Sequence, residues 1–368
     1  MRLLYAFPEP LPLERARGVQ VAHAVAELAR LGVEVELAYV PNPPLAPLAY
    51  YGVEAPAGLR LTPLARTLPW PLARVHSNRL FLWRLERRID ASPDALLFLR
   101  HLKLAALLLQ SRPGCRLVYE AHEVFSDTAP AAKRARQFEL ESLVLRQAAL
   151  VIANSVPTAE RLCELYGERA IEVLPNGVDW PEQLPPKDWA QAGQHIVYAG
   201  SFFGWKGVAD LVQAASGLPG CRIELFGGDA AQLERERSRA PAAGAQLEFR
   251  GHVPQQEVMR GLQTACIAVL PNRDDPDSRF TSPIKLFEYM AAGCAVVASD
   301  LPSLRAVLAE HEAVWVRPGE PSSLAEGIRR LAADPERARR MGEGAREKAR
   351  GFTWRARAGR LADLLRAI

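Results

Sequence analysis

The sequence of 368 residues contains little cysteine and no paired cysteine motif. No two of its five cysteines are spaced as CxxC, and most lie within apolar runs. This pattern is typical of small buried side chains in a reducing compartment rather than of disulfides or a structural metal site. An HExxH motif and a Ser-His-Asp pattern are also missing, so the sequence gives no support to zinc-protease or serine-hydrolase chemistry. The cysteines are Cys115, Cys163, Cys221, Cys266 and Cys294.

A strong excess of one charge is missing too. The net charge is +4, from 46 Lys and Arg against 42 Asp and Glu, which is too small to indicate a nucleic-acid partner. Hydrophobic residues make up 49% and charged residues 24% of the chain, as in ordinary globular proteins. The length suffices for two domains.

Long apolar runs are lacking. The longest candidate, residues 95–109, is too short for a membrane span and is interrupted by Arg100, His101 and Lys103. Residues 1–7 contain one basic residue and are followed by Pro8 and Pro10, which favours a first core strand over a signal peptide. We therefore expect a cytoplasmic protein.

Strand and helix patterns alternate along the chain, which predicts parallel sheets with helices on both faces. The expected strands of the first half are residues 3–7, 33–40, 95–99, 116–120, 150–153 and 171–174, and the helices are 19–31, 103–110, 131–146 and 157–166. A second alternating series starts at residues 195–199. The pattern predicts domains at 1–178 and 194–350, a turn-rich linker at 179–193 and a last helix at 351–368.

Residues 41–71 are rich in proline and are expected to be irregular. They lead into a basic amphipathic helix at 72–89, in which five arginines alternate with apolar residues. We interpret this helix as packing on the core with a solvated face. Peripheral contact with the inner membrane face or a lipid acceptor stays open as the alternative. The arginines are Arg74, Arg79, Arg84, Arg87 and Arg88.

The segment 282–300 has the pattern of a helix followed by a strand, after an apolar strand at 267–271. Ser282 is expected to cap the helix, Pro283 to take its first position and Gly293 to end it. A helix that begins where a parallel strand ends directs free N–H groups toward a phosphate, and Lys285 adds a full charge there.

This segment, together with others in the same order, resembles the retaining GT-B glycosyltransferases of the family-four type. The other matching segments are Asn154-Ser-x-x-Thr158, 171–179, 196–200 through Trp205-Lys-Gly207, 226–228, 249–253 and Pro254-x-x-Glu257. The resemblance implies two Rossmann-like domains facing across a cleft, with the C-terminal helix crossing back to the N-terminal domain. It also implies an acceptor-binding first domain and a second domain that binds the nucleotide sugar.

The resemblance implies that Lys206, in a loop flanked by glycines, stabilises the diphosphate of a UDP- or GDP-sugar, and that Glu288 holds its ribose. Because Pro283 has no N–H, the helix donors begin at Ile284. The full set of implied donor-binding residues is Arg17, Gly18, Gly200, Ser201, Lys206, Gly227, His252, Val253, Ser282, Ile284, Lys285 and Glu288.

Two positions depart from the family pattern. Ser201 stands where the family commonly has arginine, so Arg273 or Arg279 is considered as a replacement phosphate partner. Phe280 stands where the family commonly has the first of two glutamates, which touches the donor sugar. This second departure puts the identity of the donor sugar in doubt, but not the nucleotide site.

In the first half, His122 follows a strand and matches the histidine that the family places beside the donor sugar. Since transfer in this family is usually drawn as same-face attack, His122 would position and stabilise rather than act as nucleophile. Glu123 is a weaker candidate, as an acceptor-side base. Arg100 and His101, at the end of another strand, would face the acceptor.

The sequence Asp274-Asp-Pro-Asp277 contains an Asp-x-Asp that is typical of metal-dependent GT-A enzymes. It lies late in the second series without the flanking GT-A pattern, so we interpret it as a solvated loop and predict no metal and no cofactor. The expected function is transfer of a sugar to a glycan or lipid-linked acceptor in bacterial surface polysaccharide synthesis. A sugar-nucleotide epimerase or hydrolase of the same fold, or a non-catalytic nucleotide-sugar-binding protein, remains as an alternative.

Overall fold

The computed structural model describes residues 1–13, 15–67, 77–280 and 282–368. Its contacts divide the chain into two units. The first unit comprises Met1–Gly177 and Trp354–Ile368, and the second comprises Val178–Thr353. The chain therefore passes between the units twice, after Gly177 and after Thr353.

The first unit contains a parallel sheet in the strand order β3-β2-β1-β4-β5-β6-β7. The order reverses between β1 and β4, and open α/β sheets bind ligands at such a switch point, beyond the carboxyl ends of the strands. The strands are β1 (Arg2–Leu11), β2 (Glu34–Pro41), β3 (Leu59–Pro63), β4 (Leu96–Leu99), β5 (Leu117–Ala121), β6 (Leu150–Ala153) and β7 (Glu172–Val173).

Helices accompany the strands, because a parallel strand pair needs a crossover and an apolar sheet face must be covered. Strands β4 and β5 are buried at every position, as expected for a sheet covered on both faces. The helices of this unit are α1 (Ala16–Arg30), α2 (Asn78–Ala91), α3 (Leu102–Ser111), α4 (Phe125–Thr128), α5 (Ala131–Gln147), α6 (Val156–Tyr166) and α15 (Trp354–Arg366).

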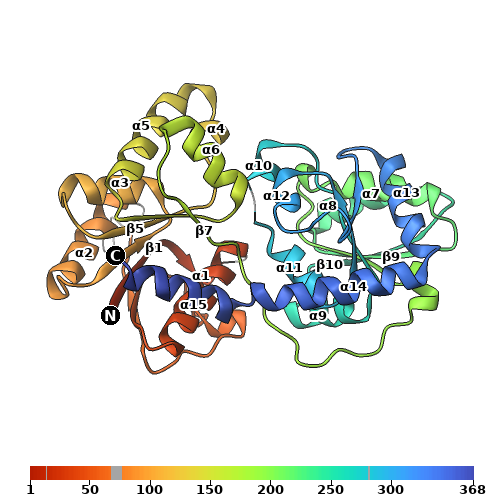
Figure 1. Ribbon diagram of the computed structural model, residues 1–368, viewed down its shortest axis with the longest axis horizontal. Coiled ribbons are helices and arrows are strands. Elements are labelled where there is room, and N and C mark those ends of the chain that lie inside the picture. Colours follow the sequence, from red (N-terminus) through yellow and green to blue (C-terminus); the bar gives the residue numbers. More distant parts are fainter. Residues whose placement is uncertain (14, 68–76, 281) are drawn as a thin grey trace. The chain divides into compact units, whose positions relative to one another are not determined.

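The last helix, α15, packs on the first unit, as predicted. Its residues Ala358, Leu361, Ala362 and Leu365 are buried in the core that β1 and α1 also build. Figure 1 shows α15 running alongside α1. The aromatic ring of Trp354 stacks on His23 of α1, with the ring centroids 5.0 Å apart. The C-terminal segment is thus an integral part of a unit formed mainly by the N-terminal half.

The second unit repeats the architecture with a parallel sheet in the order β10-β9-β8-β11-β12-β13. Its order reverses between β8 and β11. Its strands are β8 (Ile196–Ala199), β9 (Arg222–Phe226), β10 (Gln246–Gly251), β11 (Ile267–Leu270), β12 (Ala295–Ser299) and β13 (Val314–Val316). Its helices are α7 (Val208–Ala214), α8 (Ala230–Ser238), α9 (Gln255–Thr264), α10 (Pro276–Arg279), α11 (Ile284–Ala291), α12 (Pro302–Arg305), α13 (Pro321–Ala332) and α14 (Pro335–Ala349).

The predicted fold of two Rossmann-like sheets is confirmed, and the structure corrects three details. The stretch 41–71 is not wholly irregular, because it contains β3 and a 3₁₀ turn at Ala49–Tyr51. The helix α11 begins one residue later than predicted, with Pro283 at the N-cap position in extended geometry (φ −74°, ψ 113°). Residues 179–193 pack on the second unit rather than standing apart, since Lys187 Nζ donates to the Leu262 carbonyl at 3.2 Å.

The basic amphipathic helix is α2. It buries Phe81, Leu82, Leu85 and Ile89, as the core-packing interpretation predicts. The part of that prediction at residues 72–76 lies outside the described residues. Among the helices of the described ranges, none combines the length and the apolar character that a bilayer crossing requires.

Candidate functional site

The carboxyl ends of β8, β9 and β10 come together at backbone level in the second unit. The Gly200 N–H donates to the Phe226 carbonyl at 2.9 Å, and the Gly227 N–H donates to the Gly251 carbonyl at 2.7 Å. A Cβ at Gly227 would lie 2.0 Å from the Gly200 carbonyl oxygen, and Gly227 has φ +112°. Only glycine fits this contact. The predicted donor-binding glycines, Gly200 and Gly227, are therefore neighbours.

Lys285 extends from the first turn of α11 onto the same loops. A Cβ at Gly200 would lie 2.5 Å from its Nζ, so the ammonium group occupies the space that a side chain would take. Nζ donates to the Tyr198 hydroxyl at 3.2 Å and lies 4.4 Å from the ring centroid. Burial lowers the pKa of Lys285 to about 7, against the opposing effect of Glu288. The structure thus places a cation beside the end of β8 without an acidic group in direct contact among the described residues.

Glu288 lies one helical turn after Lys285 and is half-buried. Its Oε1 accepts a hydrogen bond from Gln255 Nε2 at 2.9 Å. Burial raises the pKa of Glu288 to about 7, while the hydrogen bond from Gln255 and the charge of Lys285 oppose that rise. A carboxylate of this kind favours a ligand that brings hydroxyl donors.

Lys206 lies in a 3₁₀ turn, Gly204–Lys206, directly before α7. The residue is only 9% exposed, and its Nζ lies 3.5 Å from the centroid of the Trp205 ring. The turn is tied to the loop after β11, because the Arg273 N–H donates to the Trp205 carbonyl at 2.9 Å. The loops that follow β8 and β11 are therefore joined at the switch point of this sheet.

The other predicted donor residues surround these groups to different degrees. Ser282 is buried, and Ile284 opens α11. Ser201 is exposed, and its carbonyl accepts a hydrogen bond from the Tyr198 hydroxyl at 2.8 Å. At the end of β10, His252 is exposed and Val253 is half-buried.

The two arginines considered as replacements for the missing phosphate partner are already paired. Arg273 donates to both carboxylate oxygens of Asp210, at 2.7 and 2.6 Å. Arg279 donates to both oxygens of Asp274, at 2.7 and 3.0 Å. Each carboxylate neutralises its arginine, so Lys285 is a better source of positive charge than either arginine.

In the first unit, His122 follows β5 and is held next to a buried carboxylate. Its side chain is 16% exposed, and Nε2 lies 3.1 Å from Oε2 of Glu120, although the two atoms are not aligned as a hydrogen bond. Burial and the charge of Arg100 lower the pKa of His122 to about 4, against the opposing charge of Glu120. His122 is therefore neutral at pH 7.

Glu120 is a residue that the sequence analysis missed. It is 1% exposed, and its Oε1 accepts a hydrogen bond from Gln20 Nε2 at 2.9 Å and forms an ion pair with Arg357. Although burial acts to raise the pKa of Glu120, Arg357 and His122 bring it well below its usual value. A glutamate inside the apolar strand 117–121 was the one available signal in the sequence.

Arg100 and His101, predicted to face the acceptor, have structural partners. Arg100 donates to the Gln20 side-chain oxygen. His101 caps α3, since its Nδ1 accepts a hydrogen bond from the Leu104 N–H at 3.2 Å. Burial and Arg66 lower the pKa of His101 to about 4. These contacts explain both residues without an acceptor, whose site stays a prediction.

Arg17 and Gly18 lie in the first turn of α1. Arg17 forms an ion pair with Glu9. A Cβ at Gly18 would lie 2.1 Å from the Tyr51 hydroxyl, so this glycine makes room for Tyr51. Glu123 accepts a hydrogen bond from the Thr128 hydroxyl at 3.2 Å, and this contact lowers its value as an acceptor-side base.

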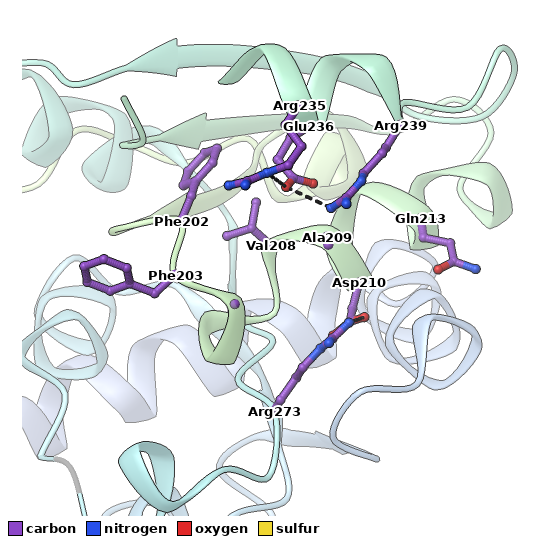
Figure 2. Close-up of a pocket in the computed structure, with 11 residues that line it drawn as sticks. Phe202, Phe203, Val208, Ala209, Asp210, Gln213, Arg235, Glu236, Arg239 and Arg273 are labelled. Carbon is purple, nitrogen blue, oxygen red and sulfur yellow. Dashed lines mark hydrogen bonds and ion pairs between the residues drawn. The ribbon is translucent and has the colours of Figure 1, made fainter. Parts of the chain in front are cut away.

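A pocket of about 580 Å³ lies beside the loop that carries Lys206 but contains none of the predicted donor residues. Figure 2 shows Arg235 and Arg239 on either side of the Glu236 carboxylate, and Asp210 meeting Arg273. The charged groups that line this pocket are largely paired with one another, so it is a weaker candidate for a diphosphate than the ends of β8 and β11.

Within the described ranges, no group of three or more His, Cys, Asp or Glu side chains is arranged to hold a metal ion. Asp274, which directly precedes the Asp-x-Asp sequence, is paired with Arg279. The predictions of no metal and no cofactor stay predictions.

Two family models match nearly the whole chain between them. The model described as "Glycosyl transferases group 1" matches residues 181–348, and "Glycosyltransferase Family 4" matches residues 18–180. Among curated relatives, D-inositol 3-phosphate glycosyltransferase 1 from Catenulispora acidiphila is 28% identical over 302 residues, covering 72% of this chain and 69% of that protein. Of two further relatives, the chain spans only 23% and 53% of their length.

Solved structures show the same fold. Sucrose-phosphate synthase from Thermosynechococcus elongatus matches with a TM-score of 0.77 and 20% identity, covering 100% of this chain and 98% of that one. HepE from Anabaena, solved in complex with UDP-glucose, matches with a TM-score of 0.74 and 18% identity over 100% of both chains. Similarity at this level of identity shows the fold alone.

Proposed function

From the premise that the chain belongs to the glycosyltransferases described by the group 1 and family 4 models, we propose that it transfers a sugar from a nucleoside diphosphate donor, with retention of anomeric configuration. The acceptor is a glycan or a lipid-linked sugar in the synthesis of a bacterial surface polysaccharide. The donor is its only small-molecule requirement, without a metal or cofactor.

The observation that carries this proposal is the position of Lys285, whose ammonium group lies against Gly200 where β8 ends. Departure of a nucleoside diphosphate leaves negative charge on its phosphates, and a preorganised cation at a helix N-terminus stabilises that charge. Burial without an acidic contact keeps Lys285 poised for an anion, since a diphosphate would favour its charged form. Lys206, on the loop joined to β11, would supply a second cation.

The nucleoside would lie over α11, with its ribose hydroxyls donating to Glu288. This carboxyl group accepts a hydrogen bond from Gln255, and its other oxygen could accept the ribose hydroxyls. Because HepE of like fold was solved with UDP-glucose, a UDP-sugar is the first donor to test, and a GDP-sugar the second.

In this proposal His122 of the first unit acts beside the donor sugar as a neutral imidazole. It would position the sugar and stabilise the transition state, while the leaving phosphate accepts the proton of the acceptor hydroxyl. Its low pKa supports a neutral role, because at pH 7 the imidazole lacks the second proton that the imidazolium form would donate as a general acid.

A hydrolase or epimerase of the same fold is the second candidate, favoured by Phe280 in place of the glutamate that the family commonly has. An enzyme with a poorly held donor sugar would release it to water. It would then produce free monosaccharide, or an epimer, without requiring an acceptor.

The proposed function is tested first by thermal unfolding with UDP, GDP and ADP. At a ligand concentration of about 100 times Kd, binding stabilises the folded state by about 2.7 kcal/mol, which raises Tm by several degrees. Lys285→Met should greatly reduce the shift, whereas Lys103→Met on the exposed face of α3 should retain it.

The UDP- or GDP-sugar of the stabilising base is then incubated with bacterial glycan and glycolipid acceptors, and the products are analysed by mass spectrometry and NMR. Acceptor-dependent product with retained configuration supports the proposal. Free sugar without acceptor favours the hydrolase, and no stabilisation by any nucleotide contradicts the proposal.

A further inference from the structure

The two oxygens of the Glu120 carboxylate have different partners. Its Oε1 meets the guanidinium group of Arg357 and the Gln20 side-chain amide, while its Oε2 lies 3.1 Å from Nε2 of His122. Two donors on one oxygen fix the rotation of a carboxylate, and this leaves the other oxygen next to the imidazole. Glu120 is 1% and Arg357 4% exposed, so water does not screen the pair.

Each donor is itself held in place. The orientation of the Gln20 amide is fixed by Arg100, which donates to its side-chain oxygen. Arg357 Nε donates to the Pro175 carbonyl at 2.9 Å, so the guanidinium group has one edge on the backbone and one on Glu120. The planar fork of arginine suits this double contact, which lysine cannot reproduce.

Arg357 also lies at the place where the chain leaves and re-enters the first unit. Pro175 precedes the first crossing at Gly177 by two residues, and Arg357 follows the second crossing at Trp354 by three. A Cβ at Gly177 would lie 2.6 Å from the Trp354 ring, so the two segments are in direct contact. The contacts that connect Pro175, Arg357, Glu120 and His122 therefore start next to the two points where the chain passes between the units.

A buried arginine–glutamate pair contributes little net stability, because desolvation offsets the attraction. Stability alone therefore does not explain a charged pair in this core. A role in orienting a neighbouring group explains the pair, because the Glu120 carboxylate lies next to His122 at the end of β5.

We propose that Arg357 is a positioning residue for the transferase reaction, which fixes the orientation and the tautomer of His122 through Glu120. The proposal rests on the proposed function, since it assigns a helper to His122. A carboxylate beside Nε2 favours the proton on that nitrogen, which leaves Nδ1 as a hydrogen-bond acceptor. The C-terminal helix α15 thereby contributes to the site from the opposite end of the sequence.

Arg357→Met alone leaves Glu120 buried and unpaired, which is strongly destabilising. The test therefore adds the double variant Arg357→Met/Glu120→Gln, which removes both charges together. The control is Arg360→Met, one turn on in α15, since Arg360 is exposed and donates only to the Val173 carbonyl at 3.0 Å among its hydrogen bonds in the described residues.

For the double variant we expect a melting curve and a UDP affinity close to those of the wild type, and a kcat lower by about 10- to 100-fold, because small misplacements of a reacting group are costly. Arg360→Met should match the wild type in all three. A double variant that is folded and retains kcat within two-fold would overturn the proposal.

A second experiment measures the tautomer and the pKa of His122 directly by ¹⁵N NMR. A His122→Asn variant assigns its signals. In the wild type we expect the Nε2–H tautomer, and in the double variant a mixture. The charged groups that face His122 are Glu120, Arg100 and Arg357. In a folded Arg357→Met variant, the pKa of His122 should rise because a nearby positive charge is lost.

An unchanged tautomer and pKa in the variants would contradict the proposal even if kcat fell, since the loss would then be structural. A wild type that transfers no sugar from any donor would overturn the proposed function and this assignment together. A wild type that transfers sugar at the same rate as the folded double variant would overturn this assignment alone.

Discussion

The two sheets share the strand order 3-2-1-4-5-6, counted within each unit, but the groups at the carboxyl ends of their strands differ. In the second unit, backbone dominates: Gly200 and Gly227 meet directly, and one lysine lies against them. In the first unit, side chains dominate, with His122 next to a buried carboxylate that an arginine and an amide hold.

Under the proposed function, this difference corresponds to two chemical tasks. A diphosphate is large and fully charged, so closely packed backbone and a cation suffice to bind it. A catalytic imidazole must be held in one orientation and one tautomer, which requires directed side-chain contacts. Variants should therefore separate binding, in the second unit, from turnover, in the first.

The largest expected effect is on turnover, from His122→Ala. We expect kcat to fall about 10²- to 10³-fold, as when one group that stabilises a transition state is removed. The UDP affinity, measured by calorimetry, should stay within two-fold. His311→Ala, at an exposed site of the second unit, serves as control. Equal losses of affinity and turnover would place His122 in nucleotide binding instead.

An intermediate effect is expected from Gly227→Ala in the second unit. The new Cβ would meet the Gly200 carbonyl oxygen at 2.0 Å in a backbone conformation that alanine rarely adopts. We expect a loss of at least about 2 kcal/mol in stability, together with weaker UDP binding. Urea unfolding and calorimetry would measure both.

The matched control for Gly227→Ala is Gly204→Ala, since a Cβ at Gly204 meets nothing within 4 Å and the residue lies on the neighbouring loop. This variant should unfold and bind UDP like the wild type. If the two variants behave alike, close packing of the glycine loops does not shape the nucleotide site.

The smallest expected effect is the pH dependence of UDP binding. Lys285 has a pKa of about 7 without ligand, and a bound diphosphate would raise that pKa. Binding above pH 7 then requires proton uptake, so the affinity should fall by up to about ten-fold as the pH rises from 7 to 8. Calorimetry in buffers of different ionisation enthalpy would detect the proton.

Lys285→Met should bind UDP more weakly and lose this slope above pH 7. Glu288 titrates in the same range, but the charged form of its carboxyl group is the better acceptor for ribose, so its contribution has the opposite sign and acts below pH 7. An affinity in the wild type that is constant from pH 7 to 9 would contradict the role of Lys285.

Much of the fold could be predicted because parallel strands buried on both faces have a clear apolar pattern. The strand at 150–153 was predicted with the bounds of β6, and α5 and α6 within one residue at each end. The strand β3 was missed because its residues are only partly buried at the edge of the sheet and lie among prolines. The N-terminus of α11 was predicted one residue too early, because serine is a favoured N-cap residue but Pro283 occupies the N-cap position.

The candidate site divides in the same way. Glycines, Lys285 and Glu288 lie within short segments whose local pattern marks a strand end and a helix start, and the resemblance of these segments to the family singled them out. The roles of Arg100 and His101 were not predictable, because the contacts to Gln20 and to the α3 backbone that now explain them depend on how the chain folds.

By itself the sequence determined the class of fold and the two alternating series, since these follow from local periodicity. The site residues after β5 and β8 and at the start of α11 were chosen through the resemblance to the glycosyltransferase family. Only the tertiary structure decided that Glu120, Gln20 and Arg357, from three distant segments, meet around one carboxylate beside His122. The physical reason is that a buried charge must find its partner in space, and separation along the chain carries no information about which partner that is.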